Sequence, residues 1–329
     1  MVNVAILGVG DIAAKMASTL STMITQGDQS LCMYSVASRD GERARRFAEQ
    51  YGFQKAYGSY EDMLSDPDVH LVYVATPHSH HYEHMKRCIA HGKHVLCEKA
   101  FTVNARQAEE VTAMARAKGL LMAEAIWTRY QPARQMILDI LGSGFIGEPK
   151  MLTANLCYPI VHKQRIREPE LAGGALLDLG VYAINFASMV FGDKVASMQS
   201  TVQMMDTGVD MQESITLTYE TGEMAILNAS VTCAGDRRGM VFCTNGTLEV
   251  DNINNPATIT VVPRAEGQET RMYTVPPQIT GYEYEMQAAV EAVTQGWVEC
   301  PAMPHSEIVR VMQVMDQLRA QWGLVYPCE

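Results

Sequence analysis

The sequence predicts an α/β domain with a doubly wound parallel sheet, followed by an α+β domain with a mainly antiparallel open sheet and helices. The chain has 329 residues, more than one hydrophobic core usually serves. Through the first third, short β-branched runs alternate with amphipathic stretches, which is typical of βαβ units. After about residue 124, apolar and polar residues alternate in consecutive extended runs, which indicates antiparallel strands. We therefore expect two domains, 1–123 and 124–329.

The first domain is expected to contain strands separated by helices. The strand-like runs are residues 4–7, 31–37, 71–75, 95–97 and 120–123. Helical patterning covers residues 43–51, 82–91 and 105–118, and a further helix follows the first strand. Gly52, Gly92 and Gly119 stand where the C-caps of these helices are needed. Strand, helix and turn signals thus agree on a parallel sheet with crossover helices.

The second domain is expected to contain a β-hairpin. Ile215, Leu217 and Tyr219 alternate with polar residues in the run 214–219, and a second extended run, 224–233, follows Gly222. Further strands are expected at 246–251, 257–263 and 269–275. A helix with one apolar face is expected at 306–322.

Composition and charge exclude several classes of function. The formal net charge of -11 at pH 7 opposes binding to nucleic acid or anionic lipid, and no basic patch overrides it. No uncharged apolar run is long enough to span a bilayer. The eight cysteines form no Cys-x-x-Cys pair, which favours reduced thiols over disulfides or a zinc site. Because no leader-like segment precedes the first strand, we expect a cytoplasmic protein that binds neither nucleic acid nor membrane.

A glycine-rich turn after the first strand predicts a dinucleotide site. It reads Gly8-Val9-Gly10-Asp11-Ile12-Ala13, and its strand–turn–helix context makes it a Rossmann fingerprint. Gly8 permits the tight turn, Gly10 lets a pyrophosphate reach the amides at the helix start, and Ala13 keeps the helix close to its strand. We take Gly8, Gly10, Asp11, Ile12 and Ala13 as cofactor-binding residues. A glycine turn that binds nothing is the alternative.

The residues after the second strand predict which dinucleotide binds. An acidic residue there would hold the ribose 2′-hydroxyl of NAD, whereas this sequence has Ala37-Ser38-Arg39-Asp40. Arg39 offers a guanidinium and Ser38 a hydroxyl to a 2′-phosphate, which favours NADP without excluding NAD. Two alternatives stay open: Arg39 as a solvated loop charge, and Asp40 as a ribose ligand.

Polar residues also follow the strand at 71–75, at the carboxyl edge where ligands bind in doubly wound sheets. They read Thr76-Pro77-His78-Ser79-His80-His81. Three histidines so close suggest a metal, but no cysteine or acidic residue stands at ligand spacing, so we expect no metal. We expect Thr76, Pro77, His78 and His81 to pack beside the cofactor.

Two further segments carry acid–base groups. Glu98 and Lys99 follow the strand at 95–97, where buried charges are costly without a purpose. The segment 173–182 is a glycine-rich entry to a mostly apolar helix, with Asp178 and Tyr182 four residues apart on one face. We expect Glu98 and Lys99 to contact the cofactor, and Asp178 and Tyr182 to share a pocket.

Together these segments resemble the glucose-fructose oxidoreductase, inositol dehydrogenase and rhizopine catabolism (Gfo/Idh/MocA) superfamily, and within it the dimeric dihydrodiol dehydrogenase branch. The resemblance spans nearly the whole chain. It rests on Ala75-Thr76-Pro77, Glu98-Lys99, the run 124–130 (Glu-Ala-Ile-Trp-Thr-Arg-Tyr), the segment 173–182, and the tail segments 303–307 (Met-Pro-His-Ser-Glu) and 321–327 (Gln-Trp-Gly-Leu-Val-Tyr-Pro). Each motif is modest evidence alone, whereas the ordered set is specific.

The resemblance implies an NADP-dependent oxidoreductase that transfers a hydride between nicotinamide and a carbinol of a sugar, polyol or cyclic, trans-dihydrodiol-like diol. It maps the family's catalytic lysine to Lys99, and the aspartate and acid–base residue of its second-domain helix to Asp178 and Tyr182. Tyrosine at position 182, where many relatives carry histidine, is similar to the dihydrodiol branch. Ala100 replaces the proline that usually follows the lysine, so the backbone there can be less rigid or differently turned. Among the roles that the resemblance implies, the orientation of Lys99 toward the substrate is therefore the least constrained. A homodimer is also implied.

The chemistry of these residues agrees with that assignment. Moving a hydride from a carbinol carbon requires the hydroxyl proton to leave, and Tyr182 can accept it while Lys99 stabilises the negative charge. Asp178 would orient Lys99 or the substrate hydroxyl. The alternative is a structural ion pair between Asp178 and Lys99, with Tyr182 in the core. Two other functions stay open: a cofactor-binding sensor without catalysis, and a non-redox enzyme with tightly bound nicotinamide.

Overall fold

The computed structural model describes all residues, 1–329, and they form two units. The first unit combines Met1–Tyr130 with Gln278–Met312, and the second combines Gln131–Pro277 with Gln313–Glu329. The expected division between residues 123 and 124 falls inside the last strand of the first sheet, Met122–Ala125, whereas the first unit continues to Tyr130. The chain therefore returns to the first unit after completing the second sheet.

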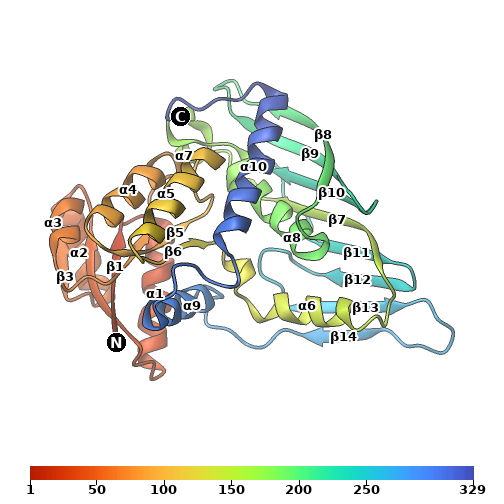
Figure 1. Cartoon of the computed structure of the whole chain (residues 1–329), viewed down its shortest axis with the longest axis horizontal. Coiled ribbons are helices and arrows are strands. Elements are labelled where there is room, and N and C mark those ends of the chain that lie inside the picture. Colours follow the sequence, from red (N-terminus) through yellow and green to blue (C-terminus); the bar gives the residue numbers. More distant parts are fainter. The chain divides into compact units, whose positions relative to one another are not determined.

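The first unit is built on a parallel sheet with the strand order β3-β2-β1-β4-β5-β6 (Figure 1). Its strands are β1 (Val2–Leu7), β2 (Leu31–Ala37), β3 (Lys55–Tyr57), β4 (Leu71–Val74), β5 (His94–Glu98) and β6 (Met122–Ala125). Every neighbouring pair is parallel. In this doubly wound order the winding reverses between β1 and β4, and ligands bind at the carboxyl ends of such strands. The predicted fold class is confirmed for this unit.

The helices of the first unit begin and end at residues that the sequence marks. Asp40 caps α2, Ser59 caps α3 and Asn104 caps α5, each accepting hydrogen bonds from backbone N–H groups of the first turn. Gly52 ends α2 in the left-handed region, with φ of 84°. The helices are α1 (Asp11–Thr25), α2 (Gly41–Tyr51), α3 (Tyr60–Ser65), α4 (His78–Ala90), α5 (Ala105–Ala117), the 3-10 turn η1 (Trp127–Arg129), α9 (Glu283–Gln295) and the first part of α10 (His305–Trp322).

Helix α9 comes from late in the chain, yet it packs against β1 and β5 (Figure 1). Met286, Ala289 and Ala292 are fully buried in the same core as the strand residues of the parallel sheet. The sequence did not predict this helix, because Glu283 and Glu285 interrupt its apolar stripe on the buried side. The first hydrophobic core is therefore completed by a segment that the sequence assigned to the second domain.

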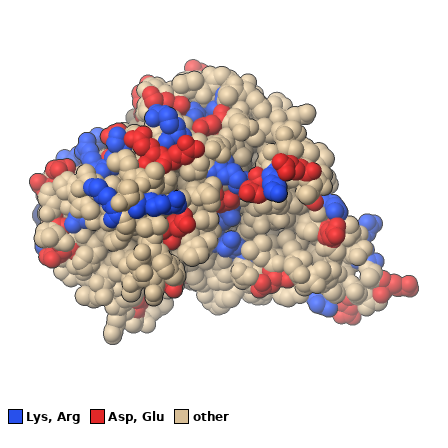
Figure 2. All heavy atoms as spheres, viewed as in Figure 1, with Lys and Arg blue, Asp and Glu red and all other residues tan.

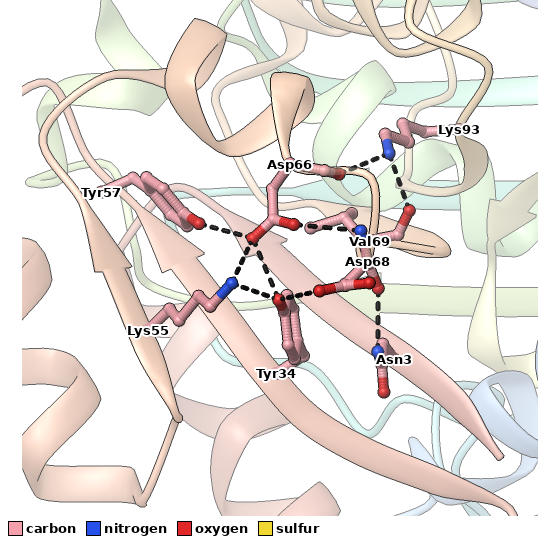
Figure 3. A network of polar contacts seen from close by, with 8 residues as sticks. All are labelled: Asn3, Tyr34, Lys55, Tyr57, Asp66, Asp68, Val69 and Lys93. Atoms are coloured by element: carbon pink, nitrogen blue, oxygen red, sulfur yellow. Dashed lines mark hydrogen bonds and ion pairs between the residues drawn. The ribbon is translucent and has the colours of Figure 1, made fainter.

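A polar network holds the edge strand β3 and the turn after α3 (Figure 3). The carboxylate of Asp66 accepts hydrogen bonds from Lys55 at 2.8 Å, Tyr57 at 2.6 Å and Tyr34 at 3.0 Å. Lys93 donates to the backbone carbonyl of Asp66 at 2.7 Å. Although burial opposes it, hydrogen bonds from Lys55 and the tyrosines hold the pKa of Asp66 well below its usual range. The network supplies contacts for a strand of three residues that the sequence did not predict.

The second unit is built on an eight-stranded sheet with the order β14-β13-β12-β11-β7-β10-β9-β8 (Figure 1). Its strands are β7 (Pro149–Cys157), β8 (Val195–Met204), β9 (Asp210–Tyr219), β10 (Met224–Ser230), β11 (Gly239–Cys243), β12 (Gly246–Val250), β13 (Thr258–Pro263) and β14 (Arg271–Thr274). β7 and β10 are parallel, and the other neighbours are antiparallel. The predicted hairpin is formed by β9 and β10, with Leu217 opposite Ala225. The fold class predicted for this half is confirmed.

A buried helical segment covers one face of the second sheet. It comprises the 3-10 turn η2 (Pro169–Leu171), the π-helix η3 (Leu176–Gly180) and α8 (Val181–Phe191), and α8 packs against β7 and β10. The stretch Pro169–Phe191 is long and apolar enough to cross a bilayer, but 83% of its most apolar window is buried inside the protein, as in a core helix. The remaining helices of this unit are α6 (Pro132–Gly142), α7 (Gln164–Arg167) and the last part of α10.

The opposite face of the second sheet carries a row of partly exposed apolar side chains. Strand pairing places Met224 beside Met151, Met151 opposite Phe242, and Val262 opposite Thr247. Met151, Met224 and Val262 are 37%, 40% and 42% exposed.

Charged side chains do not gather into a patch of one sign on the face that Figure 2 shows, where Lys and Arg lie among Asp and Glu.

Candidate active site

The glycine turn lies where β1 and β4 end side by side. Gly8 has φ of +106°, and a Cβ there would lie 2.8 Å from the backbone oxygen of Ala75, so no other residue fits. The backbone N–H of Gly8 donates to the carbonyl of Ala37 at 3.0 Å. The turn therefore sits at the reversal point of the sheet, where a dinucleotide is expected.

The start of α1 has the features of an anion site. Gly10 is the N-cap residue, no side chain caps the first turn, and a Cβ on Gly10 would meet nothing within 4 Å. The first-turn amides thus face open space with the positive end of the helix dipole behind them. Asp11 is exposed and Ile12 half-buried, whereas Ala13 is fully buried against the sheet. These five positions fit a pyrophosphate, although their role as ligands stays a prediction.

The structure separates the two charges that follow β2. Asp40 accepts hydrogen bonds from the backbone N–H groups of Glu42 at 3.0 Å and Arg43 at 3.2 Å, so its carboxylate is used as the cap of α2. Ser38 accepts a hydrogen bond from the backbone N–H of Asp40 at 3.2 Å, which tightens the turn. Arg39 is exposed. The guanidinium of Arg39 is therefore the charge that remains for a cofactor.

Tyr60 and His84 form a small cluster near Arg39, whose charge acts on both side chains. The rings of Tyr60 and His84 are 5.0 Å apart, edge to face, and Nδ1 of His84 lies 3.0 Å from Oγ1 of Thr76. Burial and the neighbouring His80, followed by other cations that include Arg39, lower the pKa of His84 to about 3. Sequence reasoning named Thr76 and Arg39 but missed Tyr60 and His84, which come from other elements.

His81 joins the loops that follow β4 and β5. Its Nε2 lies 2.7 Å from the backbone oxygen of Thr76, and its Nδ1 lies 2.9 Å from that of Ala100. His81 is completely buried, and burial lowers its pKa to about 4 despite hydrogen bonds that favour the charged form. The ring is therefore neutral at pH 7. His78 is buried at the start of α4, which Pro77 precedes as the N-cap residue. His81 thus connects the two loops through both ring nitrogens. The structure contains no group of three or more side chains that could hold a metal ion.

The carboxyl end of β5 places Glu98 and Lys99 together. Glu98 is buried, accepts a hydrogen bond from the hydroxyl of Tyr73, and accepts a second from the backbone N–H of Lys99 at 3.3 Å. The Lys99–Ala100 peptide is cis. Glu98 therefore holds the strand end that carries Lys99, whose side chain is half-buried.

Two further buried acids lie near this strand end. Glu124 accepts a hydrogen bond from the backbone N–H of Phe101 at 3.1 Å, and burial raises the pKa of Glu124 to about 8. Glu285 of α9 is completely buried, and burial together with the charges of Glu98 and Glu124 raises its pKa well above the usual range. Glu124 is therefore largely protonated at pH 7. No sequence pattern groups Glu98, Glu124 and Glu285, because they come from β5, β6 and α9.

The second unit holds Asp178 and Tyr182 on one helical segment. Asp178 lies in the π-helix and Tyr182 in the first turn of α8, and both are buried. Arg165 of α7 donates two hydrogen bonds to Asp178, with Nη1 2.8 Å from Oδ1 and Nη2 3.3 Å from Oδ2. π-helical turns occur often at functional sites. The structure thus brings Asp178 and Tyr182 onto one segment, as expected, and adds Arg165 to them.

Two acids of β9 pack behind the same segment. Asp210 accepts a hydrogen bond from the backbone N–H of Leu176 at 2.6 Å, and a Cβ on Gly174 would lie 2.1 Å from its Oδ1. A Cβ on Gly180 would lie 2.7 Å from Oε1 of Glu213. Burial raises the pKa of Asp210 to about 6 and that of Glu213 well above its usual range. Gly174 is therefore required by its positive φ and by Asp210 beside it, whereas a side chain at Gly180 would displace the carboxylate of Glu213.

The fold and these residues agree with comparisons to known proteins. A family described as an oxidoreductase family with an NAD-binding Rossmann fold matches residues 2–125, and the GFO/IDH/MocA C-terminal domain matches residues 131–249. The chain belongs to the Gfo/Idh/MocA oxidoreductase family. The trans-1,2-dihydrobenzene-1,2-diol dehydrogenases of Xenopus laevis and Homo sapiens are each 33% identical to it, over 98% of this chain and 98% and 97% of theirs. The resemblance stated from the sequence is confirmed.

Solved structures of other oxidoreductases share the whole fold. KijD10, a 3-ketoreductase from Actinomadura kijaniata solved with NADP and TDP-benzene, is similar with a TM-score of 0.87 at 27% identity, over 97% of both chains. An aldose-aldose oxidoreductase from Caulobacter crescentus, 20% identical with a TM-score of 0.86 over 99% of both chains, shows the fold alone. This Gfo/Idh/MocA protein is an NAD(P)-dependent oxidoreductase, and its first unit contains an NAD(P)-binding Rossmann domain. The individual roles of Lys99, Asp178 and Tyr182 stay predictions.

Proposed function

We propose that this oxidoreductase transfers a hydride between NADP and a carbinol of a sugar, polyol or cyclic diol. The observation that carries the proposal is a buried aspartate, held by an arginine, four residues before a buried tyrosine on one helical segment. The relatives named above support the substrate class, since two are dehydrogenases of a cyclic diol and one is a ketoreductase. A cyclic diol or a sugar offers the secondary carbinol that this chemistry needs.

The residues of the first unit fit the dinucleotide. The open space over Gly10 and the uncapped amides of α1 suit a pyrophosphate, and exposed Arg39 suits a 2′-phosphate. One carboxylate oxygen of Asp40 is used as a helix cap, which disfavours this acidic residue as a ligand of the NAD ribose. We therefore propose a preference for NADP over NAD.

In the proposed mechanism, a bound nicotinamide would supply the hydride acceptor or donor, and residues of this chain move the proton. Tyr182 takes the proton from the substrate hydroxyl during oxidation and returns it during reduction. Lys99 is assigned the stabilisation of the negative charge that develops on the substrate oxygen. Asp178 accepts a hydrogen bond from the substrate hydroxyl or from Lys99 and fixes its orientation. Glu98, bound to Tyr73 and to the backbone of Lys99, positions the strand end.

We further propose a cytoplasmic homodimer that acts on small molecules. The eight free cysteines suit a reducing compartment, and the net charge of -11 disfavours nucleic acid and anionic lipid. The exposed apolar row of the second sheet supports a partner sheet from a second copy.

The test is a screen of sugars, polyols and trans-1,2-dihydrobenzene-1,2-diol with NADP and with NAD, followed by nicotinamide absorbance. On a substrate that reacts, Tyr182→Phe and Lys99→Met should each lower kcat by about 10²- to 10⁴-fold while NADP affinity is unchanged, because a positioned acid–base group is lost. Tyr219→Phe, at a buried tyrosine of β9 in the same unit, is the matched control and should keep full activity.

The outcomes separate the alternatives. Full activity in both variants would overturn the catalytic assignment. Full activity in Tyr182→Phe alone would mean that Lys99, acting through Asp178 or water, carries the proton. No turnover with any compound, together with tight NADP binding, would indicate a sensor. Nicotinamide that stays bound through turnover would indicate a non-redox enzyme.

A further inference from the structure

The carboxylate of Asp178 lies where an isolated charge would be costly. Its neighbours in the π-helix, Leu177 and Leu179, are buried, and Asp178 itself is 4% exposed. A buried carboxylate without a counter-charge takes up a proton rather than staying ionised. A protonated Asp178 could not serve as a negatively charged acceptor. Its ionisation therefore depends on what lies beside it.

Arg165 provides a counter-charge with matched geometry. Its two terminal nitrogens reach the two carboxylate oxygens at 2.8 Å and 3.3 Å, in the parallel fork of a bidentate pair. A guanidinium stays charged at every pH at which the enzyme works, and its planar fork fixes the plane of the carboxylate. The side chain of Arg165 is 43% exposed, so its own charge remains partly hydrated.

The backbone of this region is built to hold Arg165 in place. The backbone N–H of Gly174 donates to the carbonyl of Ile166 at 2.9 Å, and that of Gly173 donates to the carbonyl of Glu168 at 3.1 Å. A Cβ on Gly173 would lie 2.4 Å from the oxygen of Ile166, so only glycine allows this approach. The hydroxyl of Tyr326 donates to the carbonyl of Gly173 at 2.8 Å. The glycine pair thus fixes α7, and with it Arg165, against the segment that carries Asp178.

We propose that Arg165 is a positioning residue for catalysis, which keeps the carboxylate of Asp178 ionised and oriented toward its reaction partner. This inference rests on the proposed function, since it gives the ionised form of Asp178 a task in turnover. Other titratable groups pack against the same segment, namely Asp210 and Glu213 of β9. A change at Arg165 leaves both of them in place, so a comparison of variants isolates the pair.

Arg167 offers a matched control on the same short helix. It pairs with Asp206 at 3.0 Å, and the two side chains are 42% and 78% exposed. An exposed pair of this kind contributes little and is screened by salt. Replacing Arg167 removes the same charge from α7 without touching Asp178.

The first experiment reads the protonation state of Asp178 without using activity. Infrared spectra of the full chain with NADP are recorded across pH for the unaltered protein, Arg165→Ala, Arg165→Lys and Arg167→Ala. The spectrum of the matching Asp178→Asn variant is subtracted from each. In Arg165→Ala, a protonated carboxyl band should persist about one to three pH units higher than in the unaltered protein, because the opposite charge is gone. Arg167→Ala should match the unaltered protein, and Arg165→Lys should lie between the two.

The second experiment measures the pH profile of kcat/KM with NADP and trans-1,2-dihydrobenzene-1,2-diol. In Arg165→Ala, the acid limb of this profile should move to higher pH by as many pH units as the infrared titration does. Arg165→Lys should restore part of this shift, and Arg167→Ala should show none. Unchanged infrared titration and an unchanged acid limb in Arg165→Ala would overturn the inference. A shifted titration with an unchanged pH profile would also overturn it, since Asp178 would then have no charged role. If the unaltered protein does not turn over, the proposed function fails for this diol, and the infrared titration alone then decides whether Arg165 keeps Asp178 ionised.

Discussion

Arg39 and Asp40 show how neighbouring residues take different tasks from one turn. The carboxylate of Asp40 accepts two backbone hydrogen bonds and caps α2, while Arg39 is exposed beside the cluster of Tyr60 and His84. The sequence alone left open whether Asp40 holds a ribose. The cap weighs against a ribose ligand, because Oδ1 of Asp40 is already shared between two backbone amides at 3.0 Å and 3.2 Å.

The cofactor preference can be tested at this residue. We expect NADP to bind more tightly than NAD, and Arg39→Ala to reduce the ratio of the two affinities by roughly 10- to 100-fold, because a charge-assisted contact to the 2′-phosphate is lost. Calorimetry with each dinucleotide measures the ratio. Arg45→Ala is the control, since Arg45 pairs with Glu42 and Glu49 on the surface of α2. Equal binding of NAD and NADP by the unaltered protein would show the assignment to be wrong.

Single residues were predictable where their chemistry is local. Gly8 and Lys99 could be found because each stands in a short pattern directly after a strand. The pairing of Arg165 with Asp178 and the burial of Glu124 and Glu285 could not be found, because the partners come from distant parts of the chain. A glutamate on an amphipathic stretch reads as a surface charge unless the fold is known.

Helices and strands, like single residues, were predictable where the signal is local and were missed where it depends on distant packing. Strands such as β2 and β4 were predicted because they are short, mostly apolar runs, as expected where both faces are buried. The edge strand β8 has no fully buried residue, and β3 has only three residues, so neither shows the required pattern. Helix α9 was missed because two of the buried residues in its first turn are glutamates, Glu283 and Glu285. The π-helix depends on packing against β9 and was read only as the start of an apolar helix.

The ends of β4 and β5 are linked by one neutral histidine, and this makes stability depend on pH. The pKa of His81 is about 4 in the folded chain and near 6.5 when unfolded, so the unfolded chain binds more protons between these values. The stability that His81 contributes is fully present above pH 6.5 and is lost as the pH falls toward 4. The loss between pH 7.5 and pH 5 should be about 2 kcal/mol.

Urea unfolding at the two pH values measures this effect. His81→Gln keeps one side-chain donor for a carbonyl and cannot take up a proton, so the change in unfolding free energy between pH 7.5 and pH 5 should be smaller than in the unaltered protein. His84, with a pKa near 3, retains its own share of the dependence. His162→Gln is the control, because His162 is exposed and lies in the second unit. An identical pH dependence in His81→Gln and the unaltered protein would show that His81 is not the group responsible.

At the scale of the whole molecule, we predict that the partly exposed apolar row of the second sheet contacts a partner. Met151 and Met224 lie side by side in adjacent strands, and Val262 extends the exposed row. Soluble monomers rarely expose a contiguous apolar strip, and methionine and aromatic residues are enriched where copies meet. A second copy related by a two-fold axis would cover this face with the same face of its own sheet.

We therefore expect a homodimer in solution, with twice the 36.4 kDa mass of the chain when measured by light scattering at micromolar concentration. Met224→Lys should shift the mass toward the monomer, because it places a charge in the apolar row, where burial against a partner would be costly. Ile24→Lys changes an equally exposed apolar residue, 39% against 40%, in the first unit and should leave the mass unchanged. A monomer mass for the unaltered protein would exclude the dimer. A dimer that persists in Met224→Lys would move the interface to another surface, and the partly exposed row would then be an ordinary solvated face of the sheet.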